Sequence, residues 1–144
     1  MMSNYYPPLG FHFKVEFDSL SGEYQFQSVS GLNVELETEQ IAEGGENRFK
    51  HKLPVSTRYP NLVLKRGIVV NSSLVRWCRD ALEDFEIKPT NITISLLNEE
   101  HEPLMTWNVV HAYPLKWSVS EFNAEKSLIA IETIELAYNY FNIQ

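Results

Sequence analysis

The stretch FHFKVEFD at residues 11–18 alternates apolar and polar side chains without interruption. Such a period of two is typical of a β-strand that buries one face and exposes the other. The apolar face is formed by Phe11, Phe13, Val15 and Phe17. We therefore expect residues 11–18 to form a strand whose four apolar side chains lie in the core.

The same alternation recurs along most of the chain. Further strands are expected near residues 23–29, 32–41, 61–67, 92–96, 105–109 and 115–119. Trp107, at the centre of one of them, is expected in the core. The last apolar run, residues 128–141, changes phase near Glu132 and Thr133, which favours a β-bulge there.

One segment instead has the spacing of an amphipathic helix. Apolar residues recur at every third or fourth position between about residues 73 and 86, and Pro89 ends the pattern. Trp77, Leu82 and Phe85 are expected on the buried face of this helix. The fold class predicted for residues 1–144 is therefore a single, mainly β domain: an antiparallel β-barrel or sandwich with one packed α-helix.

The sequence EGGE at residues 43–46 predicts the turn of a long hairpin over residues 35–53. Two adjacent glycines, Gly44 and Gly45, accept the positive φ angles of a two-residue hairpin loop. Opposite charges that face each other across such a strand pair contribute about 0.2–1 kcal/mol per pair. With the two glycines as the loop, the facing residues are Glu39 and Lys50, Glu37 and Lys52, and Leu36 and Leu53.

The net charge of the 144 residues is −7, and its components are strongly segregated. Residues 1–47 hold eight acidic residues and one lysine, and residues 48–79 hold eight basic residues and no acidic one. Residues 80–144 hold eleven acidic residues and three lysines. The acidic total argues against a general nucleic-acid-binding protein, although the central basic block leaves a local patch open.

The composition, 44% hydrophobic and 22% charged, indicates one folded domain and argues against a disordered chain. The apolar runs are too short to span a bilayer. The first ten residues, MMSNYYPPLG, lack the basic and apolar regions of a signal peptide, so we expect residues 1–9 to form an extended arm. The single cysteine, Cys78, fits synthesis in a reducing compartment.

No pattern in the sequence predicts catalysis, a metal site or a cofactor. The histidines and Cys78 lack the spacing of zinc ligands, and no glycine-rich phosphate loop is present. The acidic cluster at residues 99–102 is interpreted as a solvated turn in preference to a cation site. Lys65 and Arg66 with Tyr59 form only a weak candidate for phosphate contact. We therefore expect a protein that is not an enzyme.

Several strings in this sequence resemble the phage tail tube protein family. They are FQSVSGL at residues 26–32, EGGEN at residues 43–47, YPNLVLKRGI at residues 59–68, AYPLK at residues 112–116, and IETIELAY at residues 131–138. The resemblance extends from about Leu9 to Phe141. The Leu-Lys-Arg-Gly-Ile string at residues 64–68 is its most specific element.

The resemblance implies an inner-tube subunit of a contractile phage tail or contractile injection system, made in the cytoplasm and assembled into a tail or tail-like particle that is released in some systems. Six subunits would form a ring, and stacked rings would form a hollow conduit for DNA or effector cargo. The implied partners are further copies of the chain, a sheath protein, and baseplate, hub and cap proteins, without membrane binding. Carried onto this sequence, the implied contacts between rings lie in the arm and hairpin, at Tyr5, Tyr6, Glu35, Glu37, Glu39, Gly44, Gly45, Arg48, Lys50 and Lys52.

Three other functions remain open at this stage. The chain is also compatible with a specialised tube-family member at the baseplate or tip end, or with a type VI-like secreted tube protein. A third alternative, from a different class, is a monomeric β-sandwich binding domain for carbohydrate or protein.

Overall fold

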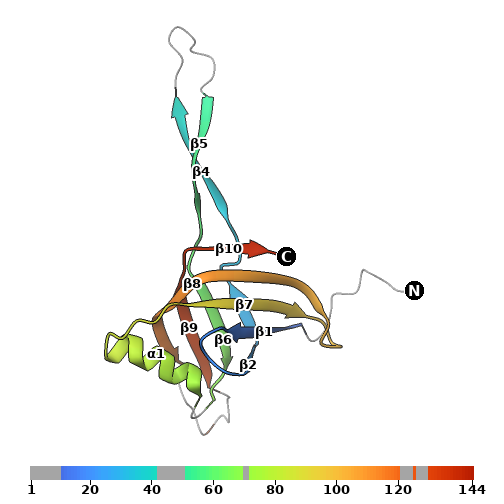
Figure 1. Cartoon of the computed structure of the whole chain (residues 1–144). Helices are drawn as coiled ribbons and strands as arrows, with labels where there is room; N and C mark the ends of the chain where they lie inside the picture. Colours follow the sequence, from blue (N-terminus) through green and yellow to red (C-terminus); the bar gives the residue numbers. More distant parts are fainter. Residues whose placement is uncertain (1–10, 42–50, 70–71, 121–124, 126–129) are drawn as a thin grey trace, which may run out of the picture.

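The structure is a computed structural model that describes residues 11–41, 51–69, 72–120, 125 and 130–144. Within these residues the chain forms ten strands and one helix (Figure 1). In chain order they are β1 (His12–Phe17), β2 (Glu23–Phe26), β3 (Ser28–Ser30), β4 (Glu35–Ile41), β5 (His51–Arg58), β6 (Leu62–Gly67), α1 (Ser73–Glu83), β7 (Thr90–Leu97), β8 (Pro103–Val119), β9 (Ile131–Ala137) and β10 (Tyr140–Ile143).

Eight strands form a bent antiparallel sheet in the order β2-β1-β7-β8-β9-β6-β3, with β10 beside β8. The long strand β8 pairs with β7 and β10 through its first part and with β9 through its last part, with a register shift between Pro114 and Lys116. At the opposite corner only Gln27 separates β2 from β3, and its N–H donates to the carbonyl of Lys65 at 2.9 Å. Strands that change sheet at corners are typical of sandwiches, so the predicted mainly β fold with one helix is confirmed.

The core lies between the two halves of the bent sheet and under α1. Val15 and Phe17 of β1, Trp77 of α1 and Trp107 of β8 are buried there. The remaining large buried side chains include Phe26, Leu62, Leu64, Leu74, Ile92, Ile94, Val109, Ile134 and Leu136. Because these residues come from every layer, the core itself fixes how the sheet halves and the helix lie against one another.

Three residues predicted to lie in the core are exposed. Phe11, 41% exposed, precedes β1, and burial decreases toward that end of the strand: Phe13 is only half-buried against the core. Leu82 is 44% exposed because it lies about 100° around the helix from the buried Ala81. Phe85 is 83% exposed because the helix ends before it.

Helix α1 is shorter at its C-terminal end than the sequence predicts. It begins after Ser72, whose side chain accepts a hydrogen bond from the N–H of Leu74 at 3.1 Å and acts as the N-cap. It ends at Glu83, and Phe85 then takes a left-handed φ of 55°. The N–H of Glu86 donates to the carbonyl of Asp80 at 2.8 Å and closes this end. The helix is neither long nor apolar enough to cross a membrane.

The predicted division of the C-terminal half into strands is wrong in two places. Residues 103–119 form one continuous strand, β8, because the break expected near Ala112 is bridged by pairing to β7 and β9. The expected bulge at Glu132 and Thr133 does not occur, because Glu132 itself lies on the buried face of β9 and keeps the alternation intact.

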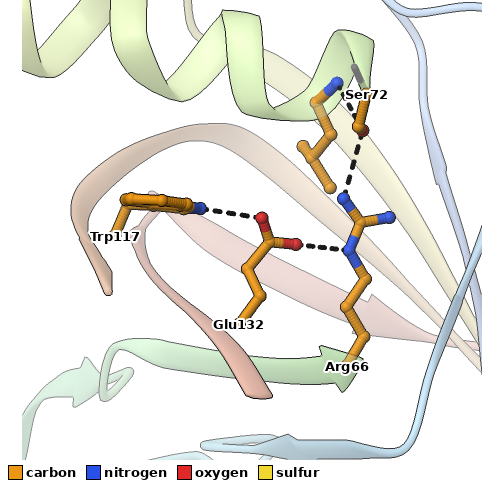
Figure 2. A network of polar contacts seen from close by, with 5 residues as sticks. Arg66, Ser72, Trp117 and Glu132 are labelled. Carbon is orange, nitrogen blue, oxygen red and sulfur yellow. Dashed lines mark hydrogen bonds and ion pairs between the residues drawn. The ribbon is translucent and has the colours of Figure 1, made fainter. Parts of the chain in front are cut away.

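Glu132 is buried because it forms an ion pair with Arg66, its cross-strand partner on β6. Arg66 Nε donates to Glu132 Oε1 at 2.5 Å, and Trp117 Nε1 of β8 donates to Glu132 Oε2 at 2.8 Å (Figure 2). The guanidinium also lies 5.3 Å from the ring centre of Phe26. Both carboxylate oxygens thus have partners, which a buried charge requires.

The same arginine connects the sheet to the start of the helix. Arg66 Nη2 donates to Ser72 Oγ at 3.1 Å, the oxygen that caps α1 (Figure 2). Beside it, Tyr24 Oη of β2 lies 2.5 Å from Ser73 Oγ. One buried ion pair therefore positions strands β6, β8 and β9 together with the N-terminus of α1.

We predict that Arg66→Met lowers the free energy of unfolding by about 3–5 kcal/mol, because it leaves the Glu132 carboxylate buried without its cation. The double variant Arg66→Met/Glu132→Leu should recover most of this loss, since no unpaired charge remains. Urea unfolding of both single variants and the double variant measures the coupling. Additive losses in the double variant would contradict the proposed dependence of the two residues on each other.

A second prediction concerns two glycines with positive φ angles, Gly22 at 92° and Gly31 at 95°. Alanine costs about 1–2 kcal/mol in a left-handed conformation, so Gly22→Ala, where the added methyl group meets open space, should show that cost alone. Gly31→Ala should be clearly more destabilising, because its Cβ overlaps the backbone carbonyl oxygen of Asn61. Equal unfolding midpoints for the two variants would argue against the close packing at Asn61.

Candidate assembly surface

Strands β4 and β5 form a separate two-stranded hairpin that extends away from the body of the protein (Figure 1). Every described residue of both strands is exposed. An isolated two-stranded hairpin is marginally stable in water. A segment of this kind depends on contacts that one copy of the chain does not supply.

The predicted register of this hairpin is wrong. Glu39 faces Leu53, Gln40 faces Lys52 and, beyond a register shift between Glu37 and Thr38, Glu37 faces Ser56 and Leu36 faces Thr57. The expected pairs Glu37–Lys52 and Leu36–Leu53 are therefore absent. The prediction took Gly44 and Gly45 as a two-residue loop, whereas the observed register differs by three residues, and an odd shift moves side chains to the opposite face.

In the observed register one face of the hairpin is largely apolar. Side chains at odd positions of β5 share a face with the residues opposite them, because side chains alternate along a strand. We call this the apolar hairpin face; it comprises Leu36, Ile41, Leu53 and Val55, together with Glu39, His51 and Thr57. Its four aliphatic residues are all exposed, Val55 by 60%.

The other face of the hairpin is polar and charged. Arg58 Nη1 lies 3.9 Å from Glu37 Oε1, and Ser56 Oγ donates to Glu37 Oε2 at 3.2 Å. Glu35 faces Arg58, and Lys52 lies further along the same face. Exposed pairs of this kind contribute at most about 1 kcal/mol, so they do not by themselves hold the hairpin in place.

Aromatic packing holds the base of the hairpin against the body. The ring of Tyr59, directly after β5, lies 5.1 Å from the ring of Phe141 on β10 and 5.9 Å from that of Tyr138. Burial raises the pKa of Tyr138 to about 12. Nearby, Asn61 Nδ2 donates to Glu135 Oε2 at 3.0 Å. These contacts fix the direction in which the hairpin leaves the sheet.

The remaining predicted interface residues lie outside the described residues. They are the arm at residues 1–9 with Tyr5 and Tyr6, and the hairpin tip with Gly44, Gly45, Arg48 and Lys50. Of the predicted interface, the structure places Glu35, Glu37, Glu39 and Lys52 on the hairpin.

The central basic block does not form one phosphate-binding patch. Arg66 is buried against Glu132, while Arg58 pairs with Glu37 on the hairpin. Arg79 pairs with Glu83 on α1, where Arg79 Nη2 and Glu83 Oε2 are 3.3 Å apart. The sequence gave no local signal for burial of Arg66; the signal available was its position in the alternation Leu62, Leu64, Arg66.

The residues considered for metal binding or nucleophilic chemistry do not form such a site. His101 Nδ1 lies 3.0 Å from His12 Nε2, and the side chain of Asn98 accepts from the N–H groups of Glu100 and Glu102, as in an ordered turn. Within the described ranges no three acidic, histidine or cysteine residues gather as metal ligands. Burial raises the pKa of the Cys78 thiol to about 12, so it stays protonated and unreactive at neutral pH.

A groove runs beside α1, at the end of the body away from the hairpin (Figure 1). It has a volume of about 430 Å³. We call it the helix groove; its lining residues are Val75, Cys78, Arg79, Leu82, Glu83 and Trp117. Most of these side chains present carbon to the opening, with one cation and one carboxylate from the Arg79–Glu83 pair on its wall.

Comparison with known proteins agrees with this architecture. A chain in the structure of the anti-feeding prophage (AFP) baseplate is 31% identical, with a TM-score of 0.82 over 99% of this chain and 97% of that one. A chain of the PVC sheath-tube complex, from an extracellular contractile injection system in the extended state, is 30% identical, with a TM-score of 0.78 over 98% and 93% of the two chains.

More distant structures share the fold alone. Hcp1 from Flavobacterium johnsoniae is 13% identical, with a TM-score of 0.56 over 92% of this chain and 94% of that one. Among curated proteins, no relative matches this sequence. The family model described as T4-like virus tail tube protein gp19 matches residues 9–142, nearly the whole sequence. The chain therefore belongs to the T4-like virus tail tube protein gp19 family.

Proposed function

We propose that the protein is the inner-tube subunit of a contractile injection system or phage tail. Hexameric rings stack into a hollow tube inside a contractile sheath, and the tube conducts DNA or protein cargo when the sheath contracts. The family match and the likeness to a chain of a sheath-tube complex support this function. The role is structural and needs no catalytic residue.

The observation that carries the proposal is the exposed hairpin with one apolar face. Leu36, Ile41, Leu53 and Val55 form a row of aliphatic side chains outside the core. A contiguous exposed apolar surface of this kind marks a protein contact site. A neighbouring ring would cover the face and supply the packing that a lone hairpin lacks.

The sheath, baseplate and cap are the further partners of this proposal. Two similar chains come from a sheath-tube complex and from a sheath/tube terminator, both in the extended state. The charges outside the hairpin contact, including Lys52 and Glu35 on its polar face, are available to such partners. The arm at residues 1–9 is proposed to join the hairpin in contacts between rings.

A second candidate function is that of a tube-family member at one end of the tube. It is favoured by the likeness to chains in a baseplate structure and in a tube-terminating cap structure. Electron microscopy of the purified protein separates these functions. Long tubes of uniform width support the main tube subunit, single rings support the terminal member, and dispersed monomers would support a binding domain instead.

We predict that Val55→Lys abolishes tubes, because it places a charge on the apolar hairpin face. The matched control Ser56→Lys changes the next residue, which lies on the polar face beside Glu37, and should leave the tubes intact. Negative-stain electron microscopy measures tube length, and the thermal unfolding midpoint, expected to be unchanged in both variants, shows that the body is folded. Tubes of normal length from Val55→Lys would exclude the apolar face as the contact.

A further inference from the structure

The protein exposes a second apolar surface, around the helix groove. Leu82 on the wall of the groove is 44% exposed, and Phe85 and Ile87 follow it at the end of α1. Phe85 takes a left-handed φ of 55°, a conformation that a bulky residue rarely adopts and that turns its ring into solvent. The local structure therefore places an aromatic side chain in water at the cost of backbone strain.

The two apolar surfaces lie at opposite ends of the molecule. The hairpin extends beyond one end of the sheet, and α1 lies at the other end (Figure 1). A contact between two different surfaces of identical subunits is heterologous, and it repeats without limit when the surfaces lie at opposite ends. This geometry suits a stacked tube, whereas a contact of the hairpin with a second hairpin would close after two copies.

The surfaces also match in chemistry. The apolar hairpin face presents four aliphatic side chains and one acidic residue, Glu39. The helix groove offers an apolar floor with Trp117 and Val75, and a cation, Arg79, on its wall. Hydrophobic burial would supply the stability of the contact, and the Glu39–Arg79 attraction would favour one orientation.

We propose that the apolar hairpin face of one copy docks into the helix groove of a second copy in the adjacent ring. The proposal rests on the proposed tube function and names the surface that receives the hairpin. Each subunit then uses its hairpin toward one neighbour and its groove toward the other. Both exposed apolar surfaces are covered along the tube, and only the two tube ends leave one of them open.

Cross-linking in assembled tubes tests the contact directly. The double variant Val55→Cys/Leu82→Cys is assembled and treated with a short bis-maleimide; the native Cys78 is buried and protonated and does not interfere. A ladder of cross-linked oligomers on a denaturing gel is expected. Each single variant, and Val55→Cys combined with Leu104→Cys at the start of β8, should give no ladder. Intact tubes of the Val55→Cys/Leu82→Cys variant without cross-links would overturn the proposal.

A charge in the groove provides a second test. Leu82→Asp should prevent tubes while the unfolding midpoint stays unchanged, because Leu82 is exposed in the single copy. If Val55→Lys blocks tubes and Leu82→Asp does not, the hairpin contact stands and the groove is not its receptor. Normal Leu82→Asp tubes that no longer bind sheath protein would assign the groove to the sheath instead. If the wild type forms no tubes at all, the proposed function itself fails.

Discussion

The buried ion pair between Arg66 and Glu132 is the constraint on which the rest of the structure depends. It holds two charges in the core, and each charge is tolerated only because the other lies directly across the β6–β9 pair. The partners of the two side chains then determine their surroundings: Trp117 of β8 bonds the carboxylate, and Ser72 at the helix start bonds the guanidinium. Sheet, corner strand and helix are thus joined at one polar centre.

This arrangement separates a stable body from an exposed hairpin. Trp117 contacts the ion pair through its indole N–H and also lines the helix groove, so the groove is built on the most constrained part of the core. The hairpin has no such support beyond the aromatic contacts of Tyr59 at its base. A rigid receptor at one end and a projecting apolar hairpin at the other are well suited to repeated head-to-tail contact.

Sequence reasoning succeeded where local periodicity decides the structure. The alternation around Val15 and Phe17 and the helical spacing around Trp77 both indicated the elements that form. It failed where a residue's environment comes from distant parts of the chain. Glu132 was interpreted as a break in an apolar pattern because its partner, Arg66, is 66 residues away. Leu82 and Phe85 fit the helical pattern but lie at its edge and beyond its end.

By itself the sequence determined a mainly β domain with one helix, a long hairpin and membership of a tube family, because side-chain period and characteristic strings are local properties. Only the tertiary structure decided which face of the hairpin is apolar, since the register depends on the shift between Glu37 and Thr38. It also decided that two opposite charges belong in the core. Burial of a charge is favourable only when strand pairing brings its counter-charge to the same place, and no single segment contains that information.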